Sequence, residues 1–261
     1  MALTNKTIAS TYGDILQADN SGSGRTANGT TIKDGLGQST ALTLGQNKLH
    51  VKPSTDQTDA VVIETSGGTD LLVVDTSNSA VKLGTSQTYA NTQIQKFSVF
   101  DVGTADGTHY AMFAEPSQAD LGAGGTGYLT SFGTGTDPAT SFTISSAADF
   151  LVACYWYIPA AITIDEVRVL GAGEAADTVN FHLQSYTMAT GTGSDAGDLS
   201  SGTLLAHNGS TLTVGADRIT TTTLTVDSAN VAADKVVLAF IENVGATTDL
   251  TAHLIIKYHY Q

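Results

Sequence analysis

The sequence predicts an all-β protein that consists of an N-terminal extended arm, a short trimeric β-stalk and a C-terminal antiparallel β-sandwich of jelly-roll type. Composition is the first reason, because glycine is abundant at 27 residues and lysine plus arginine number only 11. The second is that many short runs alternate apolar and polar residues between glycine- or aspartate-containing turns. We place the arm at residues 1–47, the stalk at 48–90 and the sandwich at 91–261.

The arm is polar and has too few apolar side chains for a core of its own. Glycine and serine interrupt it at residues 20–24 and again at 35–37. We therefore expect a partner to order the arm, with self-association or crystal contacts as the alternatives.

The stalk is predicted from a ladder of short strands at residues 49–52, 60–63, 71–74 and 80–83. Two of these runs are apolar at successive positions, so both of their faces require burial. A ladder of about 35 residues cannot bury two faces alone. Three copies around a common axis would bury them, and packing on the C-terminal domain of the same chain is the alternative. The expected trimer core consists of Leu49, Val51, Val62, Leu72, Val74 and Val81.

The sandwich is predicted from strand-like segments that turn-rich loops separate. Many antiparallel strands of this length, with glycine and aspartate in the turns, are typical of two packed sheets. Cys154 lies in an apolar run at 150–156, where we expect it to be a small buried hydrophobe. The predicted strands are residues 95–100, 109–113, 162–170, 178–186, 220–226, 235–241 and 250–260.

The net charge of −14 is concentrated in residues 91–261, which carry five basic and seventeen acidic side chains. Such a surface repels phosphate backbones and anionic membranes, so we expect no nucleic-acid partner. The first residues lack the apolar core of a signal peptide, and no run is long enough to span a membrane. We expect assembly in a cytoplasm and no membrane insertion.

Catalytic patterns are absent from the sequence, so we expect neither an enzyme nor a cofactor. The glycines at 122–127 fit a dinucleotide fingerprint but lack its strand and helix. The six histidines share no local ligand spacing. Asp165 and Glu166 are adjacent on a strand and point to opposite faces, which argues against a glycosidase pair. Asp195 and Asp198 could at best hold a divalent cation.

Polar loops in the sandwich are candidates for contact with a host receptor, because sandwich loops gather at its two ends. The loops are residues 187–202, 206–210 and 245–249. Their small polar side chains could bind the hydroxyls of a surface glycan, and the alternative is ordinary solvated turns. The candidate receptor residues are Asp195, Asp198, His207 and Asn208.

Residues 6–21 (KTIASTYGDILQADNS), 32–37 (IKDGLG) and 71–76 (LLVVDT) resemble the N-terminal half of fibre-type virion proteins of tailed, especially marine, bacteriophages. The segments 162–167 and 258–260 are similar to the distal domains attached to such proteins. The resemblance implies trimers, an N-terminal segment bound to the particle and an outward C-terminal domain. The residues that it implies for anchoring to the virion are Lys6, Ile8, Tyr12, Ile15 and Leu16.

Two functions remain open at this point. The chain could be a tail fibre, head fibre or spike on the virion surface that touches the host, held through its arm by a tail adaptor, nozzle or capsid protein. It could instead be a decoration or cement protein on the capsid. Heptads and shaft repeats are missing from the sequence, which favours a short spike or a capsid-mounted fibre over a long tail fibre. A polysaccharide-degrading tailspike is disfavoured, since β-helix repeats and a carboxylate pair are missing too.

Overall fold

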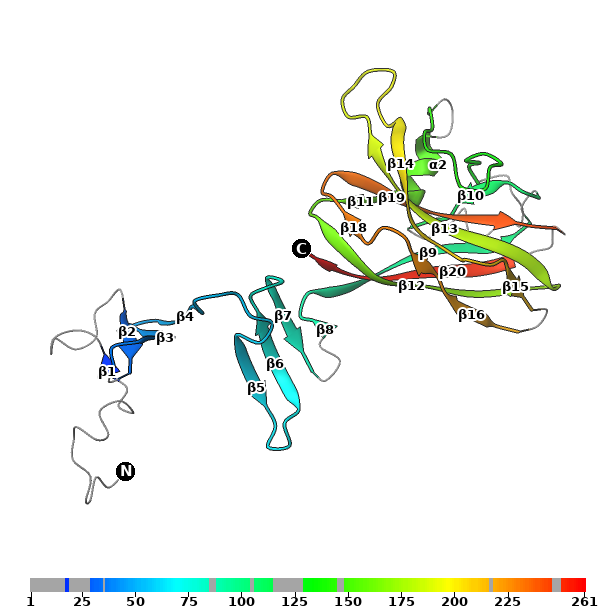
Figure 1. Ribbon diagram of the computed structural model, residues 1–261. Helices are drawn as coiled ribbons and strands as arrows, with labels where there is room; N and C mark the ends of the chain where they lie inside the picture. Colours follow the sequence, from blue (N-terminus) through cyan, green and yellow to red (C-terminus); the bar gives the residue numbers. More distant parts are fainter. Residues whose placement is uncertain are drawn as a thin grey trace, which may run out of the picture. The chain divides into compact units, whose positions relative to one another are not determined.

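The computed structural model describes residues 17–18, 29–34, 36–84, 88–103, 106–114, 129–144, 148–215, 218–245 and 250–261. Strands dominate these residues, whose one helix is α2 (Ala148–Cys154), and the prediction of an all-β protein is confirmed. The chain divides into two compact units, residues 1–90 and 91–261 (Figure 1). No helix in the described part of the chain has the length and apolarity that crossing a membrane requires.

The first sheet of the N-terminal unit lies partly inside the region expected to be an extended arm. Its four antiparallel strands follow one another in the order β1–β2–β3–β4. The last strand pairs with β3, so Leu49 and Val51 belong to this sheet and not to the ladder that follows. The strands are β1 (Gln17–Ala18), β2 (Thr30–Lys33), β3 (Ser39–Leu44) and β4 (Leu49–Val51).

The second sheet of this unit confirms the remaining strands of the predicted ladder. Each strand pairs with its sequence neighbour in the order β5–β6–β7–β8. Gly68 lies in the turn between β5 and β6 with a φ of 78°, a conformation that glycine adopts without steric cost. The strands are β5 (Val61–Glu64), β6 (Asp70–Asp75), β7 (Ala80–Leu83) and β8 (Thr88–Tyr89).

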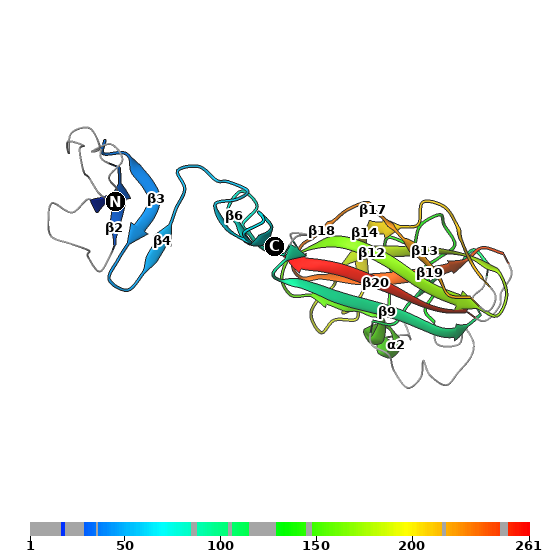
Figure 2. The ribbon, with the colours of Figure 1, turned by 90° about the horizontal axis from the view of Figure 1, so that it is seen from below.

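The C-terminal unit is built from two antiparallel sheets (Figure 2). One sheet has the strand order β10–β19–β13–β14–β17, with β11 paired to β19 and β15 to β13, and we call it the β13 sheet. Its strands are β10 (His109–Ala111), β11 (Trp156–Ile158), β13 (Asp177–Met188), β14 (Leu199–His207), β15 (Leu212–Val214), β17 (Thr225–Val226) and β19 (Lys235–Asn243).

The other sheet has the order β16–β12–β20–β9, with β18 paired to β12, and we call it the β12 sheet. Its long strands β12 and β20 pair over nearly their whole length, with one register shift between Ile164 and Glu166. The strands are β9 (Thr92–Val102), β12 (Ile162–Gly173), β16 (Thr220–Thr223), β18 (Asn230–Val231) and β20 (Leu250–Tyr260).

One hydrophobic core joins the two sheets. Alternation along each strand sends one set of side chains inward, as the sequence pattern predicts. Val167 on β12, Phe181 on β13 and Leu254 on β20 are fully buried members of this core. The β13 sheet turns one face to this core. Its other face carries the aromatic and histidine clusters of the C-terminal unit.

Two segments differ from their sequence interpretation. The loop predicted at 187–202 ends earlier, because β14 begins at Leu199 even though its start is rich in serine and glycine. Ser201 has a positive φ of 55°, and the pairing with β13 shifts register twice, which explains why polar residues with weak alternation still form a strand. The apolar run at 150–156 spans the end of α2 and the start of β11, and Cys154 is buried as predicted.

Candidate functional site

Six aliphatic side chains gather on one face of the strands β5, β6 and β7 in the second N-terminal sheet. Residues that pair across antiparallel strands share a face. The pairs Val61–Val74 and Val74–Val81 form one row, and the pairs through Leu72 form a second. Three of the side chains are about half exposed, Ile63 at 53 %, Leu83 at 47 % and Val81 at 41 %. We call this surface the β5–β7 apolar face, and it consists of Val61, Ile63, Leu72, Val74, Val81 and Leu83.

The opposite face of the same sheet carries polar and charged side chains as well as apolar ones. Lys82 donates to the carboxylate of Asp75 across 2.6 Å, and Asn78 donates to the same carboxylate. These two hydrogen bonds, that of Lys82 first, lower the pKa of Asp75 to about 2. Val62 pairs with Val73 on this face, so the register separates it from the predicted core residues Leu72, Val74 and Val81. Sequence alone could not assign these faces, since β5 and β6 are apolar at successive positions.

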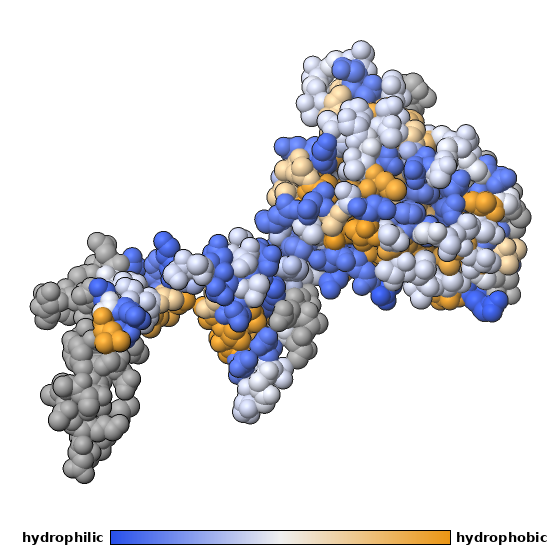
Figure 3. Space-filling model, in the orientation of Figure 1, coloured by the Kyte–Doolittle hydropathy of each residue, from blue (hydrophilic) through white to orange (hydrophobic). Residues whose placement is uncertain are grey.

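In the first N-terminal sheet, the paired part of β3 and β4 is apolar on one face. Leu44 pairs with Leu49, and Leu42 pairs with Val51. Leu49 is 65 % exposed, the most of the four side chains. On the other face a row of polar side chains crosses the sheet, where Thr31 pairs with Thr43 and Thr43 with His50. Figure 3 shows apolar surface over β5 and β6 of the second sheet and a smaller area near β3 and β4.

Three of the four candidate receptor residues already have partners within the C-terminal unit. Asp198 accepts a hydrogen bond from the backbone N–H of Ile144 at 2.8 Å. His207 lies at the end of β14 and forms an ion pair of 2.7 Å with Asp227. Asp195 alone lies on the exposed part of the loop, which runs from residue 189 to 198. The four residues therefore do not form one polar surface.

Asn208, the fourth, ties the end of β14 to β13. Its side-chain oxygen accepts from the backbone N–H of Phe181 at 2.6 Å, and its amide donates to the carbonyls of Val179 and Ser210. Both β13 residues are fully buried in the core. Asn208 thus satisfies backbone groups that water does not reach.

Replacing Asn208 by alanine should lower the free energy of unfolding by about 1–3 kcal/mol, because the Phe181 N–H would lose its acceptor in a buried position. Asp195→Ala is the matched control on the exposed loop, with an expected change within about 0.5 kcal/mol. Denaturant unfolding of both variants measures the difference. Equal stabilities would contradict the assigned role of Asn208.

A segment that we call the strap, residues 129–144, crosses the outer face of the β13 sheet. At one end Phe132 donates to the carbonyl of His109 at 2.7 Å, and His109 donates to Gly133. At the other end Gly202 donates to Thr140 at 2.8 Å. In between, Ala139 accepts from the hydroxyl of Tyr186 at 2.8 Å.

The strap also contributes an aromatic cluster to the outer face of the sheet. The ring of Phe132 stacks on Phe142 with centroids 4.5 Å apart and contacts Phe240 at 4.9 Å. Tyr186 and Leu238 complete a second hydrophobic core here, separate from the one between the sheets. The strap is therefore held by apolar packing as well as by hydrogen bonds at its ends.

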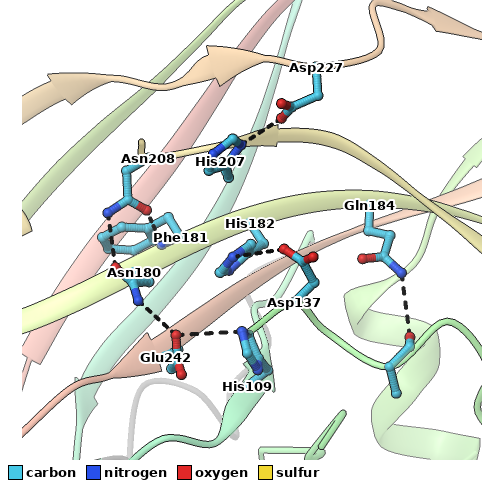
Figure 4. Close-up of polar contacts among 11 residues, drawn as sticks. His109, Asp137, Asn180, Phe181, His182, Gln184, His207, Asn208, Asp227 and Glu242 are labelled. Carbon is cyan, nitrogen blue, oxygen red and sulfur yellow. Dashed lines mark hydrogen bonds and ion pairs between the residues drawn. The ribbon is translucent and has the colours of Figure 1, made fainter. Parts of the chain in front are cut away.

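A cluster of polar side chains lies next to this second core (Figure 4). The strand register places His109, Glu242 and Asn180 in one row across β10, β19 and β13. His182 on β13 pairs with His207 on β14. Nε2 of His109 lies 3.6 Å from Glu242, and the Asn180 amide donates to the same carboxylate at 2.8 Å. Three of the six histidines thus come together from positions far apart in the sequence.

Two of these histidines are buried with unsatisfied nitrogens. His109 is 0 % exposed, and among the described residues neither of its ring nitrogens has a hydrogen-bond partner. His182 is 4 % exposed, its Nδ1 is likewise unpartnered there, and its Nε2 lies 3.7 Å from Asp137 of the strap. The rings of His109 and His182 contact each other edge to face at 4.8 Å.

Burial holds both histidines in the neutral form. It lowers the pKa of His182 to about 3, with the neighbouring His109 and His207 adding to the effect. Burial also lowers the pKa of His109, although the Glu242 carboxylate opposes this. Either imidazole can still bind a proton, but protonation in the buried position costs free energy. In the described part of the chain, no three histidine, cysteine or carboxylate side chains are placed to hold a metal ion.

The sequence interpretation missed this cluster, because its members are single residues on different strands. The alternation of β13 does place Asn180, His182 and Gln184 on the face opposite Phe181. The strand pattern alone therefore predicts that these three polar side chains share a face. Asp165 and Glu166 make separate ion pairs, with His259 at 2.9 Å and Arg168 at 2.8 Å. They do not act on a common site.

The five residues expected to anchor the chain, which all precede residue 17, lie outside the described residues. The glycines at 122–127 lie outside them as well. Comparison with known protein families finds none that matches this chain, and a search of curated proteins finds no match either.

Proposed function

We propose that the chain is a structural protein of a bacteriophage virion, a homotrimeric surface fibre or spike that the N-terminus anchors to the particle. Its C-terminal unit would face the host surface, and the role would be structural and not enzymatic. The observation that carries the proposal is the β5–β7 apolar face. The resemblance of residues 6–21, 32–37 and 71–76 to fibre-type virion proteins supplies the biological context.

Apolar side chains gather on one face of a small sheet when that face is meant for burial. Six aliphatic residues occupy the β5–β7 apolar face without a polar side chain among them. Burying a half-exposed aliphatic side chain contributes about 1 kcal/mol, and three chains would each contribute several. A second copy of the same chain is the partner that this surface fits, since self-association brings equal apolar faces together.

The first sheet supports the same arrangement. Its apolar face, which carries Leu42, Leu44, Leu49 and Val51, repeats the one-sided pattern of the second sheet. We infer that both faces point to the trimer axis. Five of the six predicted core residues lie on these two faces, and Val62 is the exception. The number of copies, three, rests on the resemblance to fibre proteins.

We further propose that the C-terminal unit is a jelly-roll sandwich. Support comes from the strand orders β9–β20–β12–β16 and β10–β19–β13–β14. Eight strands divided between two sheets in these orders, with the first strand beside the last, follow jelly-roll connectivity. The outward loops of such a unit could contact a host glycan, and Asp195 is the candidate that keeps an exposed position.

The proposal places the chain on the virion surface after assembly in the host cytoplasm. The arm would bind a tail or capsid protein through Lys6, Ile8, Tyr12, Ile15 and Leu16. A capsid decoration protein remains the second candidate, favoured by the short length of the two small sheets relative to an extended shaft. Immunogold labelling of particles distinguishes the two, because it locates the chain on the tail or on the capsid.

Deleting residues 1–16 removes all five proposed anchors and leaves every described strand intact. The truncated chain should keep its oligomeric state and lose incorporation into particles, since the anchor would be gone and the sheets would remain. Immunoblots of purified particles, together with light scattering of the free protein, measure both properties. Normal incorporation of the truncated chain would contradict anchoring by this segment.

A further inference from the structure

We propose that the strap is acid-sensitive: protonation of His109 and His182 releases residues 129–144 from the outer face of the β13 sheet while the rest of the C-terminal unit stays folded. The inference does not depend on the proposed virion function. Its basis is a pair of buried histidines in mutual contact, placed where the strap meets the sheet.

While the strap lies on the sheet, which we call the closed state, the surroundings of His109 and His182 disfavour two imidazolium ions. His109 is fully buried, and its ring lies 4.8 Å from that of His182. His182 in turn stacks on His207 with centroids 6.4 Å apart. Charges that are buried this close to one another repel and lose hydration, so protonation favours any state that exposes the rings to water.

Carboxylates around the pair offset only part of this cost. Glu242 on β19 lies 3.6 Å from His109, and its other contact is the Asn180 amide. Asp137 on the strap lies 3.7 Å from His182, but its side chain is 56 % exposed and therefore well screened by water. His207 on β14 already has a carboxylate partner in Asp227.

The strap can leave without breaking either sheet. It is bonded to β10 through His109 and Ala111, and to β14 through Leu199 and Gly202. None of these bonds belongs to the ladders that pair β10 with β19 or β14 with β13. Its release would expose the aromatic cluster of Phe132, Tyr186 and Phe240, so the unit would present a new apolar surface only in acid.

The direction of the pH effect follows from linkage. Above pH 6.5 the histidines are neutral whether the strap is closed or open, and closure carries no penalty. Between pH 6.5 and about 3, His182 is protonated when it is exposed and neutral when the strap covers it. Lowering the pH through this range therefore raises the population of the open state. From pH 7.5 to pH 5 this gain is about 30-fold for His182 alone, given a pKa of about 6.5 when exposed.

Hydrogen exchange of the full chain, analysed by mass spectrometry, tests the proposal. Amides of Phe132, Ala139, Phe142 and Ile144 are hydrogen-bonded in the closed strap. Their protection factors, corrected for the intrinsic pH dependence of exchange, should fall at least about 30-fold between pH 7.5 and pH 5. Protection in β12 and β20 should hold. Unchanged strap protection, or an equal loss in β12 and β20, would overturn the proposal.

Three variants sharpen the test. The double variant His109→Phe and His182→Phe removes both proton acceptors and keeps an aromatic ring at each position, and its strap should keep full protection at pH 5. Asp137→Asn removes an exposed carboxylate that raises the pKa of buried His109 in the closed state, so release should shift to higher pH. His253→Asn alters a histidine on the β12 sheet and should behave as wild type. Acid release in the double variant, or a shift to lower pH in Asp137→Asn, would refute the mechanism.

Discussion

Replacing Val74 by aspartate is expected to convert the proposed trimer into monomers. Val74 occupies the middle strand of the β5–β7 apolar face, flanked by Val61 and Val81. Three copies of the change would bring three carboxylates together at the proposed axis, and each unpaired buried charge costs several kcal/mol. That cost is of the same size as the gain from burying the aliphatic side chains, so little free energy would remain to hold the copies together. Light scattering at micromolar concentration measures the outcome.

Val62→Asp is the matched control for this prediction. Val62 lies one position along β5 from residues of the apolar face, points to the other side of the sheet and is 37 % exposed. Its carboxylate would remain in water, so the variant should stay trimeric. A trimeric Val74→Asp, or dissociation of Val62→Asp alone, would show that the wrong face has been assigned to the axis.

Replacing Gly202 by valine is expected to displace the strap. A Cβ at this position would lie 2.7 Å from Cα of Thr140 and 2.9 Å from the ring of Tyr186. The strap backbone must then move, and the hydrogen bond from Gly202 to Thr140 is lost. Overpacking of this kind costs about 1–3 kcal/mol, which lowers the melting temperature by about 2–4 °C per kcal/mol in a domain of this size.

Gly209→Ala is the control for the strap prediction, because the nearest atom to its added Cβ is 3.7 Å away and its φ is not positive. Calorimetry should find this variant close to wild type. Equal melting temperatures for Gly202→Val and wild type would mean that the close approach of β14 to the strap does not constrain the fold.

The sequence predicted the strands of the sandwich well because their alternation is strong. The segments 162–170, 178–186, 235–241 and 250–260 all lie within observed strands, β12, β13, β19 and β20. Each of these strands has one face in the core between the sheets. Burial of that face requires an apolar residue at every second position, and this alternation is visible in the sequence.

Features that depend on pairing between distant residues escaped prediction. Two neighbouring apolar residues in β5 leave the register undetermined, so the sequence alone cannot separate Val62 from the residues of the opposite face. The start of β14 looks like a loop, since its bulged pairing permits serine and glycine. The histidine cluster requires contacts between residues 109, 182 and 207, and no local pattern encodes them.

We propose that copies of this chain associate through the apolar faces of the two N-terminal sheets. The most direct test is the mass of the purified full-length chain by light scattering across a range of micromolar concentrations. We expect three times the chain mass of 26.9 kDa, constant over that range. A mass of one chain at every concentration would contradict it.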